Sequence, residues 1–126
     1  MQRRWLMTGA LLMMLAVGLG AFGAHALKPL IGVDALSTYE TGVKYHLIHA
    51  VGLLVVAVIM GQWGESGLLK WSARLLFAGI VLFSGSLYLL SITGARVFGP
   101  ITPFGGVCFV TGWFLLFWAA LKKQQG

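Results

Sequence analysis

Charged residues are scarce in this 126-residue chain, at 10% of the total, and only three of them are acidic. The single cysteine, Cys108, excludes an intramolecular disulfide, and its place inside an apolar run favours a packing role. The chain has no glycine-rich nucleotide loop, no metal-ligand spacing and no nucleophile beside a base. The sequence therefore predicts no cofactor, no metal site and no catalytic residue, and it does not by itself reveal a biochemical activity.

Apolar residues are abundant instead, because 59% of the chain is hydrophobic and the mean hydropathy is +0.90. A water-soluble fold could not bury so much apolar surface, so the lipid bilayer is the expected solvent. The length allows four crossings of about 20 residues each and leaves no room for a soluble domain. We predict an all-α fold, an integral membrane bundle of four transmembrane helices in one domain over residues 1–126, with spans at about 5–26, 45–62, 71–93 and 103–121.

Helix-breaking and capping residues separate these spans. Pro29 lacks a backbone donor and is expected to end the first helix, and Asp34 or Ser37 is expected to cap the second. Thr102 ahead of Pro103 places a capping residue before a proline at the first helical position, which predicts the start of the last helix. The connections between the spans are therefore short.

The first span also has features of a secretory signal peptide. Arg3 and Arg4 precede it, and Ala24-His25-Ala26 resembles a cleavage site. The apolar stretch is longer than the usual 7–15 residues or so of such a signal, which favours an uncleaved helix. Small residues at a spacing of four predict that one side of this helix contacts another helix: Ala16, Gly20 and Ala24.

The positions of the cations predict the orientation in the membrane. They stand singly or in pairs at the edges of the apolar runs, so they indicate topology and headgroup contact, and no nucleic-acid partner is expected. Under the positive-inside rule both termini are cytoplasmic, in the inner (plasma) membrane of a bacterium or else in an organelle membrane. Six cations flank the predicted inner side (Arg3, Arg4, Lys70, Arg74, Lys122 and Lys123) and three the outer side (Lys28, Lys44 and Arg96).

Four sequence blocks resemble the domain of unknown function 423 family, a family of small membrane proteins that includes bacterial inner-membrane members and the eukaryotic transmembrane protein 256. The resemblance spans nearly the full chain and implies a compact multi-helix membrane protein, but it implies no agreed activity and no catalytic residue. The blocks are residues 21–28 (AFGAHALK), 38–50 (TYETGVKYHLIHA), 83–88 (FSGSLY) and 99–106 (GPITPFGG), followed by Gly112-Trp113.

Polar residues near the ends of the apolar runs form the candidate site. His25 closes the first span, and His46 and His49 open the second, so an antiparallel hairpin would bring all three to a similar depth. These imidazoles can hydrogen-bond neighbouring helices, carry protons across the membrane, or bind a metal or haem. The candidate polar cluster consists of His25, Tyr39, His46, His49, Ser84 and Tyr88.

Glu40 and Lys44 lie one helical turn apart, which predicts an exposed ion pair worth about 0.3–0.5 kcal/mol.

The sequence favours a structural or accessory protein that contacts membrane lipids, another membrane protein or a second copy of itself. The alternative is a small oligomeric transporter or channel with a proton-sensitive histidine cluster. An enzyme is not predicted, because no charged or nucleophilic group lies deep in a span.

Overall fold

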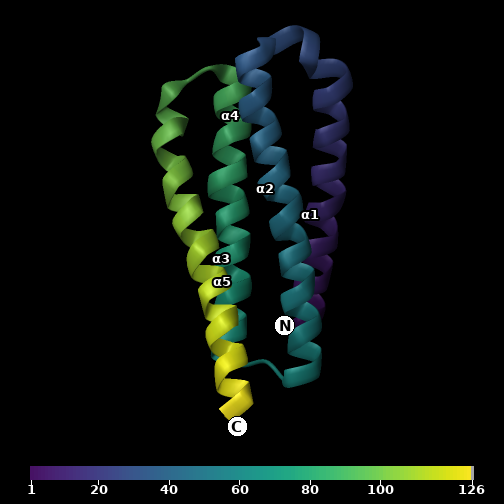
Figure 1. Ribbon diagram of the computed structural model, residues 1–126. Coiled ribbons are helices and arrows are strands. Elements are labelled where there is room, and N and C mark those ends of the chain that lie inside the picture. Colours follow the sequence, from purple (N-terminus) through teal and green to yellow (C-terminus); the bar gives the residue numbers. More distant parts are fainter. Residues whose placement is uncertain (126) are drawn as a thin grey trace.

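The computed structural model describes residues 1–125, and they form only helices and short connections, which confirms the all-α prediction for this part of the chain. Two of the elements are single π-helical turns, η1 and η2, inserted into longer helices, and η3 is a 3-10 helix (Figure 1). The elements are α1 (Gln2–Phe22), η1 (Gly23–Leu27), α2 (Lys28–Trp63), α3 (Gly67–Gly79), η2 (Ile80–Ser84), α4 (Gly85–Thr93), η3 (Arg96–Ile101) and α5 (Thr102–Gln125).

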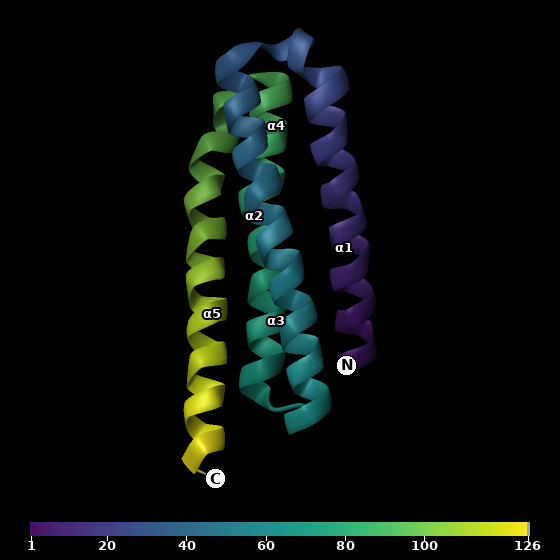
Figure 2. The same ribbon diagram turned by 45° about the vertical axis from the view of Figure 1, so that its right-hand side comes forward.

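Three helical stretches of the described chain are long and apolar enough to cross a membrane: Gln2–Trp63, Gly67–Thr93 and Arg96–Lys123. This differs from the four separate helices predicted from the sequence, because α1, η1 and α2 follow one another without an intervening loop. The first stretch nevertheless folds back on itself. α1 and α2 lie side by side and antiparallel in both views (Figures 1 and 2).

The reversal occurs at Gly32 rather than at Pro29. Pro29 lies in the first turn of α2, where a missing backbone donor breaks no helical hydrogen bond. Gly32 has φ 85° and ψ 171°, a left-handed conformation that favours glycine, and it is the non-helical residue inside α2. Asp34 and Ser37 lie inside α2 and make no side-chain cap, so the predicted cap is wrong. The last helix starts within one residue of the predicted position, since α5 begins at Thr102, but Thr102 is itself helical and its hydroxyl pairs with Ser86, so its predicted capping role is wrong.

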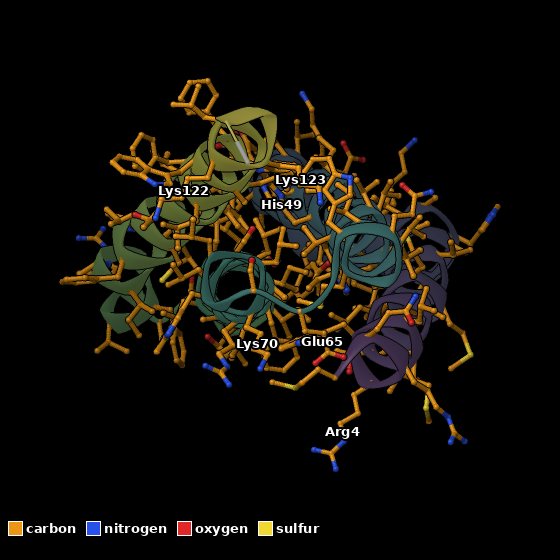
Figure 3. All side chains as sticks on the ribbon, turned by 90° about the horizontal axis from the view of Figure 1, so that it is seen from below. Arg4, His49, Glu65, Lys70, Lys122 and Lys123 are labelled. Carbon is orange, nitrogen blue, oxygen red and sulfur yellow. The ribbon has the colours of Figure 1, made fainter. Side chains whose placement is uncertain are left out.

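Both termini lie at one end of the bundle (Figure 1). We call this the terminal end. It also holds the α2–α3 connection, whereas the α1–α2 reversal and η3 lie at the opposite, distal end (Figures 1 and 2). Seen from the terminal end, charged side chains surround the helix ends (Figure 3). Those labelled there are Arg4, Glu65, Lys70, Lys122 and Lys123.

Close helix contacts form where small residues meet the neighbouring helix. Ala16 of α1 is fully buried, as the spacing of small residues predicts, whereas Ala24 is exposed. Gly105 of α5 lies directly against the backbone of η2, because a Cβ at this position would stand 2.3 Å from the backbone nitrogen of Phe83. Such contacts matter in lipid, where packing replaces the hydrophobic effect as the drive for helix association.

Glu65 ties the start of α1 to the α2–α3 connection. The backbone N–H of Gln2 donates to the Glu65 carboxylate at 3.3 Å, and the terminal ammonium of Met1 lies 3.5 Å from the same oxygen. The hydrogen bond from Gln2, together with this positive charge, holds the pKa of the Glu65 carboxyl below its ordinary value. The attachment is therefore present at neutral pH.

Loss of this attachment is expected as the pH falls below about 4.3, the ordinary glutamate value, and through the lower pKa of the folded state. Glu65→Gln should weaken it already at pH 7, because the neutral amide oxygen can still accept from Gln2 but no longer pairs with the terminal ammonium. Amide hydrogen exchange in the first turn of α1, corrected for intrinsic rates, is then expected to rise about two- to threefold, because an exposed ion pair contributes little. Glu40→Gln at the distal end should leave this exchange unchanged. Equal exchange in both variants would contradict the role of Glu65.

Candidate functional site

Four polar side chains of the predicted cluster meet in the distal half of the bundle. The Nδ1 atom of His46 on α2 lies 2.8 Å from the hydroxyl of Tyr88 on α4. The rings of Tyr39 and Tyr88 are 5.3 Å apart, and Tyr39 is fully buried. Ser84 donates a hydrogen bond of 2.7 Å to the backbone carbonyl of Gly42. The cluster thus joins α2 to the helix formed by η2 and α4.

The two π-helical turns flank this cluster. A Cβ on Gly23, the first residue of η1, would stand 2.3 Å from the Tyr39 ring, so the ring packs directly on this turn. The Tyr39 hydroxyl donates to the backbone carbonyl of Leu19 in the preceding turn. Ser84 is the last residue of η2. Single π-helical turns often occur at functional sites, which makes this cluster the main candidate for a polar site.

His46 has one ring nitrogen without a hydrogen bond. Its side chain is only 4% exposed, and Nε2 has no partner among the described residues. The carbonyl of Leu12 on α1 lies near the ring but does not meet hydrogen-bond geometry. An unpaired buried polar group costs about 1–3 kcal/mol. Nε2 can be a bare acceptor or carry the proton, depending on whether Nδ1 donates to Tyr88 or accepts from it.

His49 is buried but faces a different neighbour. Its ring stacks on Phe109 of α5 with centroids 3.5 Å apart and an interplanar angle of 12°. Its Nδ1 lies 2.8 Å from the backbone carbonyl of Tyr45, so Nδ1 carries the proton and donates. Because a step of three residues turns a helix by about 300°, His46 and His49 straddle two contact faces. The two imidazoles therefore do not converge on one ligand.

His25 does not join the cluster, so the prediction that the hairpin gathers all three histidines is wrong. Its side chain is exposed, and no hydrogen bond to another described residue forms. The reason is local, since His25 lies in the middle of η1, where only the first and last residues are buried. Within residues 1–125, moreover, no three His, Cys, Asp or Glu side chains are placed to hold one metal ion.

A groove of about 350 Å³ runs between α1 and α2 at the distal end. The predicted ion pair between Glu40 and Lys44 is wrong, since their charged groups do not come within 4.0 Å of each other. Both residues are exposed and line this groove instead, which we call the α1–α2 groove. Its walls are otherwise mainly small or apolar: Gly20, Gly23, Ala24, Tyr39, Val43, Leu47 and Ile48.

Comparison with known proteins assigns the chain to a family. The family model described as "Protein of unknown function (DUF423)" matches residues 19–106, which is more than half of the chain. The chain belongs to this DUF423 family. The matched range contains the whole cluster of Tyr39, His46, Ser84 and Tyr88, together with the residues of the α1–α2 groove. The resemblance seen in the sequence blocks is thereby confirmed.

Relatives of this DUF423 member carry the name of membrane proteins. The UPF0382 membrane protein YwdK of Bacillus subtilis is 48% identical over 118 residues, covering 94% of this chain and 96% of its own. A UPF0382 membrane protein of Staphylococcus epidermidis is 46% identical, with 94% and 95% covered. One of Staphylococcus haemolyticus is 42% identical over the same shares. No solved structure matches the chain.

Proposed function

We propose that this DUF423 member is an accessory protein of the bacterial inner (plasma) membrane that crosses four times and binds a phospholipid in the α1–α2 groove. The single observation behind lipid binding is that Glu40 and Lys44 carry opposite charges, form no ion pair with each other and line an otherwise mainly apolar groove. The proposal assigns the chain no catalysed reaction.

Four crossings follow if each arm of the folded-back first stretch spans the bilayer on its own. α1 has 21 residues and α2 has 36, and a crossing needs about 20. By their positions along the chain, six cations flank the terminal end and three the distal end, so the positive-inside rule favours cytoplasmic termini. Bacterial relatives named as membrane proteins support the location.

The order of groups along α2 matches the order of groups in a phospholipid. Lys44 lies about 6 Å deeper in the bundle than Glu40, since four residues rise by 1.5 Å each. A lipid phosphate bound at Lys44 would place its outer hydroxyl or ammonium group beside the Glu40 carboxylate, which accepts hydrogen bonds. One acyl chain would then continue down the apolar wall past Leu47 and Ile48. A phospholipid thus satisfies both charges and the wall.

Filling the mouth of the groove tests this proposal. Ala24 lines the groove and is exposed, and Ala26, in the same π-helical turn, is exposed but does not line it. Ala24→Leu should reduce phospholipid retained after purification in mild detergent, measured by native mass spectrometry, whereas Ala26→Leu should not. Lys44→Gln is expected to weaken lipid binding about fivefold, since one cation near a membrane surface contributes about 1 kcal/mol. Equal lipid retention by all variants would refute the groove as a lipid site.

A small transporter or channel is the second candidate function. The observation that favours it is the buried, unpaired Nε2 of His46, since ionisable groups at membrane depth often serve ion pathways. Against it, the imidazole is surrounded by packed side chains, and His49 is stacked on Phe109 rather than facing the same space. The accessory role explains the cluster as hydrogen bonds that hold helices together.

A further inference from the structure

We propose that a second groove, at the terminal end, binds an anionic phospholipid through Lys122 and Lys123. This terminal groove has a volume of about 270 Å³ and lies between the end of α2, the start of α3 and the end of α5. Trp63 and the two lysines contribute to its lining, and Leu69 and Ala119 form its apolar floor. None of these residues belongs to the α1–α2 groove, so this inference goes beyond the proposed function.

No residue that the structure describes neutralises the charge of the two lysines. Both are exposed, and neither forms an ion pair with any described residue. Glu65, the acidic residue at this end, is engaged by the terminal ammonium and the backbone N–H of Gln2. Figure 3 shows Glu65 on the α1 side of the bundle and the lysines on the α5 side. An anionic group in the groove would therefore meet two cations and no carboxylate from residues 1–125.

The floor of the groove identifies the anion as part of a lipid. Leu69 is 1% exposed and Ala119 is 7% exposed, so the base of the groove is apolar rather than polar. Trp63 is 37% exposed at the rim, and tryptophan is typical of the membrane interface. Leu68 also lines the groove and is half-buried, so Leu68 and Trp63 leave apolar surface that an acyl chain would cover and a soluble phosphate would not. Basic pockets between helix ends are suited to anionic headgroups.

Binding of phosphatidylglycerol and phosphatidylcholine with identical acyl chains tests the proposal, using purified full-length protein and native mass spectrometry. Phosphatidylglycerol is expected to bind about 25-fold more tightly, because each of the two lysines strengthens binding about fivefold. The double variant Lys122→Gln with Lys123→Gln should lose this preference. Arg3→Gln with Arg4→Gln removes the same charge from the same end at exposed positions that do not line the groove, and it should retain the preference.

A second pair of variants tests the groove itself while leaving all charges in place. Ala119→Phe would fill the floor, and Ala120→Phe adds the same bulk at the adjacent exposed position. Loss of phosphatidylglycerol binding in the first but not in the second supports the groove. If the double arginine variant loses the preference for phosphatidylglycerol as fully as the double lysine variant does, the preference reflects diffuse charge attraction and the proposal is overturned. Displacement of the lipid by millimolar inorganic phosphate would also overturn it, because it would identify a soluble anion as the occupant.

Discussion

Replacing Gly105 by alanine is expected to destabilise the folded protein by about 2–3 kcal/mol. The added Cβ would stand 2.3 Å from the backbone nitrogen of Phe83 and 2.7 Å from its Cα. Backbone atoms cannot move aside as a flexible side chain can, so α5 would have to separate from η2. The loss of packing is costly in lipid because no hydrophobic effect draws the helices together again.

Gly106→Ala is the matched control for this prediction. Its Cβ would meet nothing closer than the Phe83 Cδ2 atom at 4.0 Å, so the same substitution one residue later should change stability by less than about 0.5 kcal/mol. Reversible unfolding of both variants in mixed detergent micelles gives the comparison. If the two glycine variants unfold at the same denaturant concentration, the close approach of α5 to η2 does not stabilise the fold.

These two glycines illustrate what the sequence predicts well. Apolar runs of membrane length predict helices, and a pair of glycines at the start of a run predicts a close contact. The sequence does not tell which glycine faces the neighbour, because that depends on the rotation of α5 about its axis. The rotation is set by packing against η2, which lies far away in the chain.

The reversal between α1 and α2 was harder to predict, because proline and glycine both mark the segment. Proline interrupts a helix only when a helical hydrogen bond needs its nitrogen, and Pro29 falls in a first turn where none does. The left-handed backbone of Gly32 makes the reversal instead. The sequence does not predict the π-helical turns η1 and η2 either, because the extra residue in such a turn is set by packing rather than by residue type.

The candidate site was predicted in part for the same reason. The sequence named Tyr39 and His46 as members of the polar cluster, and both are buried on α2. Spacing alone could not place His25, whose exposure depends on η1, nor reveal that His49 stacks on Phe109 of a distant helix. The sequence also did not predict that Glu40 and Lys44 form no ion pair, because opposite charges four residues apart in a helix ordinarily indicate one.

The hydrogen bond between His46 and Tyr88 is expected to stabilise the fold by an amount that a double-mutant cycle can isolate. Tyr88→Phe removes the hydroxyl that pairs with Nδ1, so that neither ring nitrogen of the buried imidazole keeps a hydrogen bond to a described residue, at a cost of about 1–3 kcal/mol. The double variant His46→Leu with Tyr88→Phe removes both polar groups. Its loss in free energy of unfolding should therefore be about 1–2 kcal/mol smaller than the sum of the losses in the two single variants. Tyr45→Phe, whose hydroxyl has no hydrogen bond among the described residues, is the control and should cost less than about 0.5 kcal/mol.

The same double variant separates the two candidate functions. Because it lacks unpaired buried polar groups at this point, it should remain folded and can be reconstituted beside the unmodified protein. A proton-coupled transporter requires flux into proteoliposomes that changes near pH 6–7 in the unmodified protein and disappears in the variant. The accessory role requires no flux from either and unchanged phospholipid binding in the α1–α2 groove of the variant. Flux that depends on His46 would therefore support the transporter, because an imidazole that only holds helices together is not expected to transfer protons across the membrane.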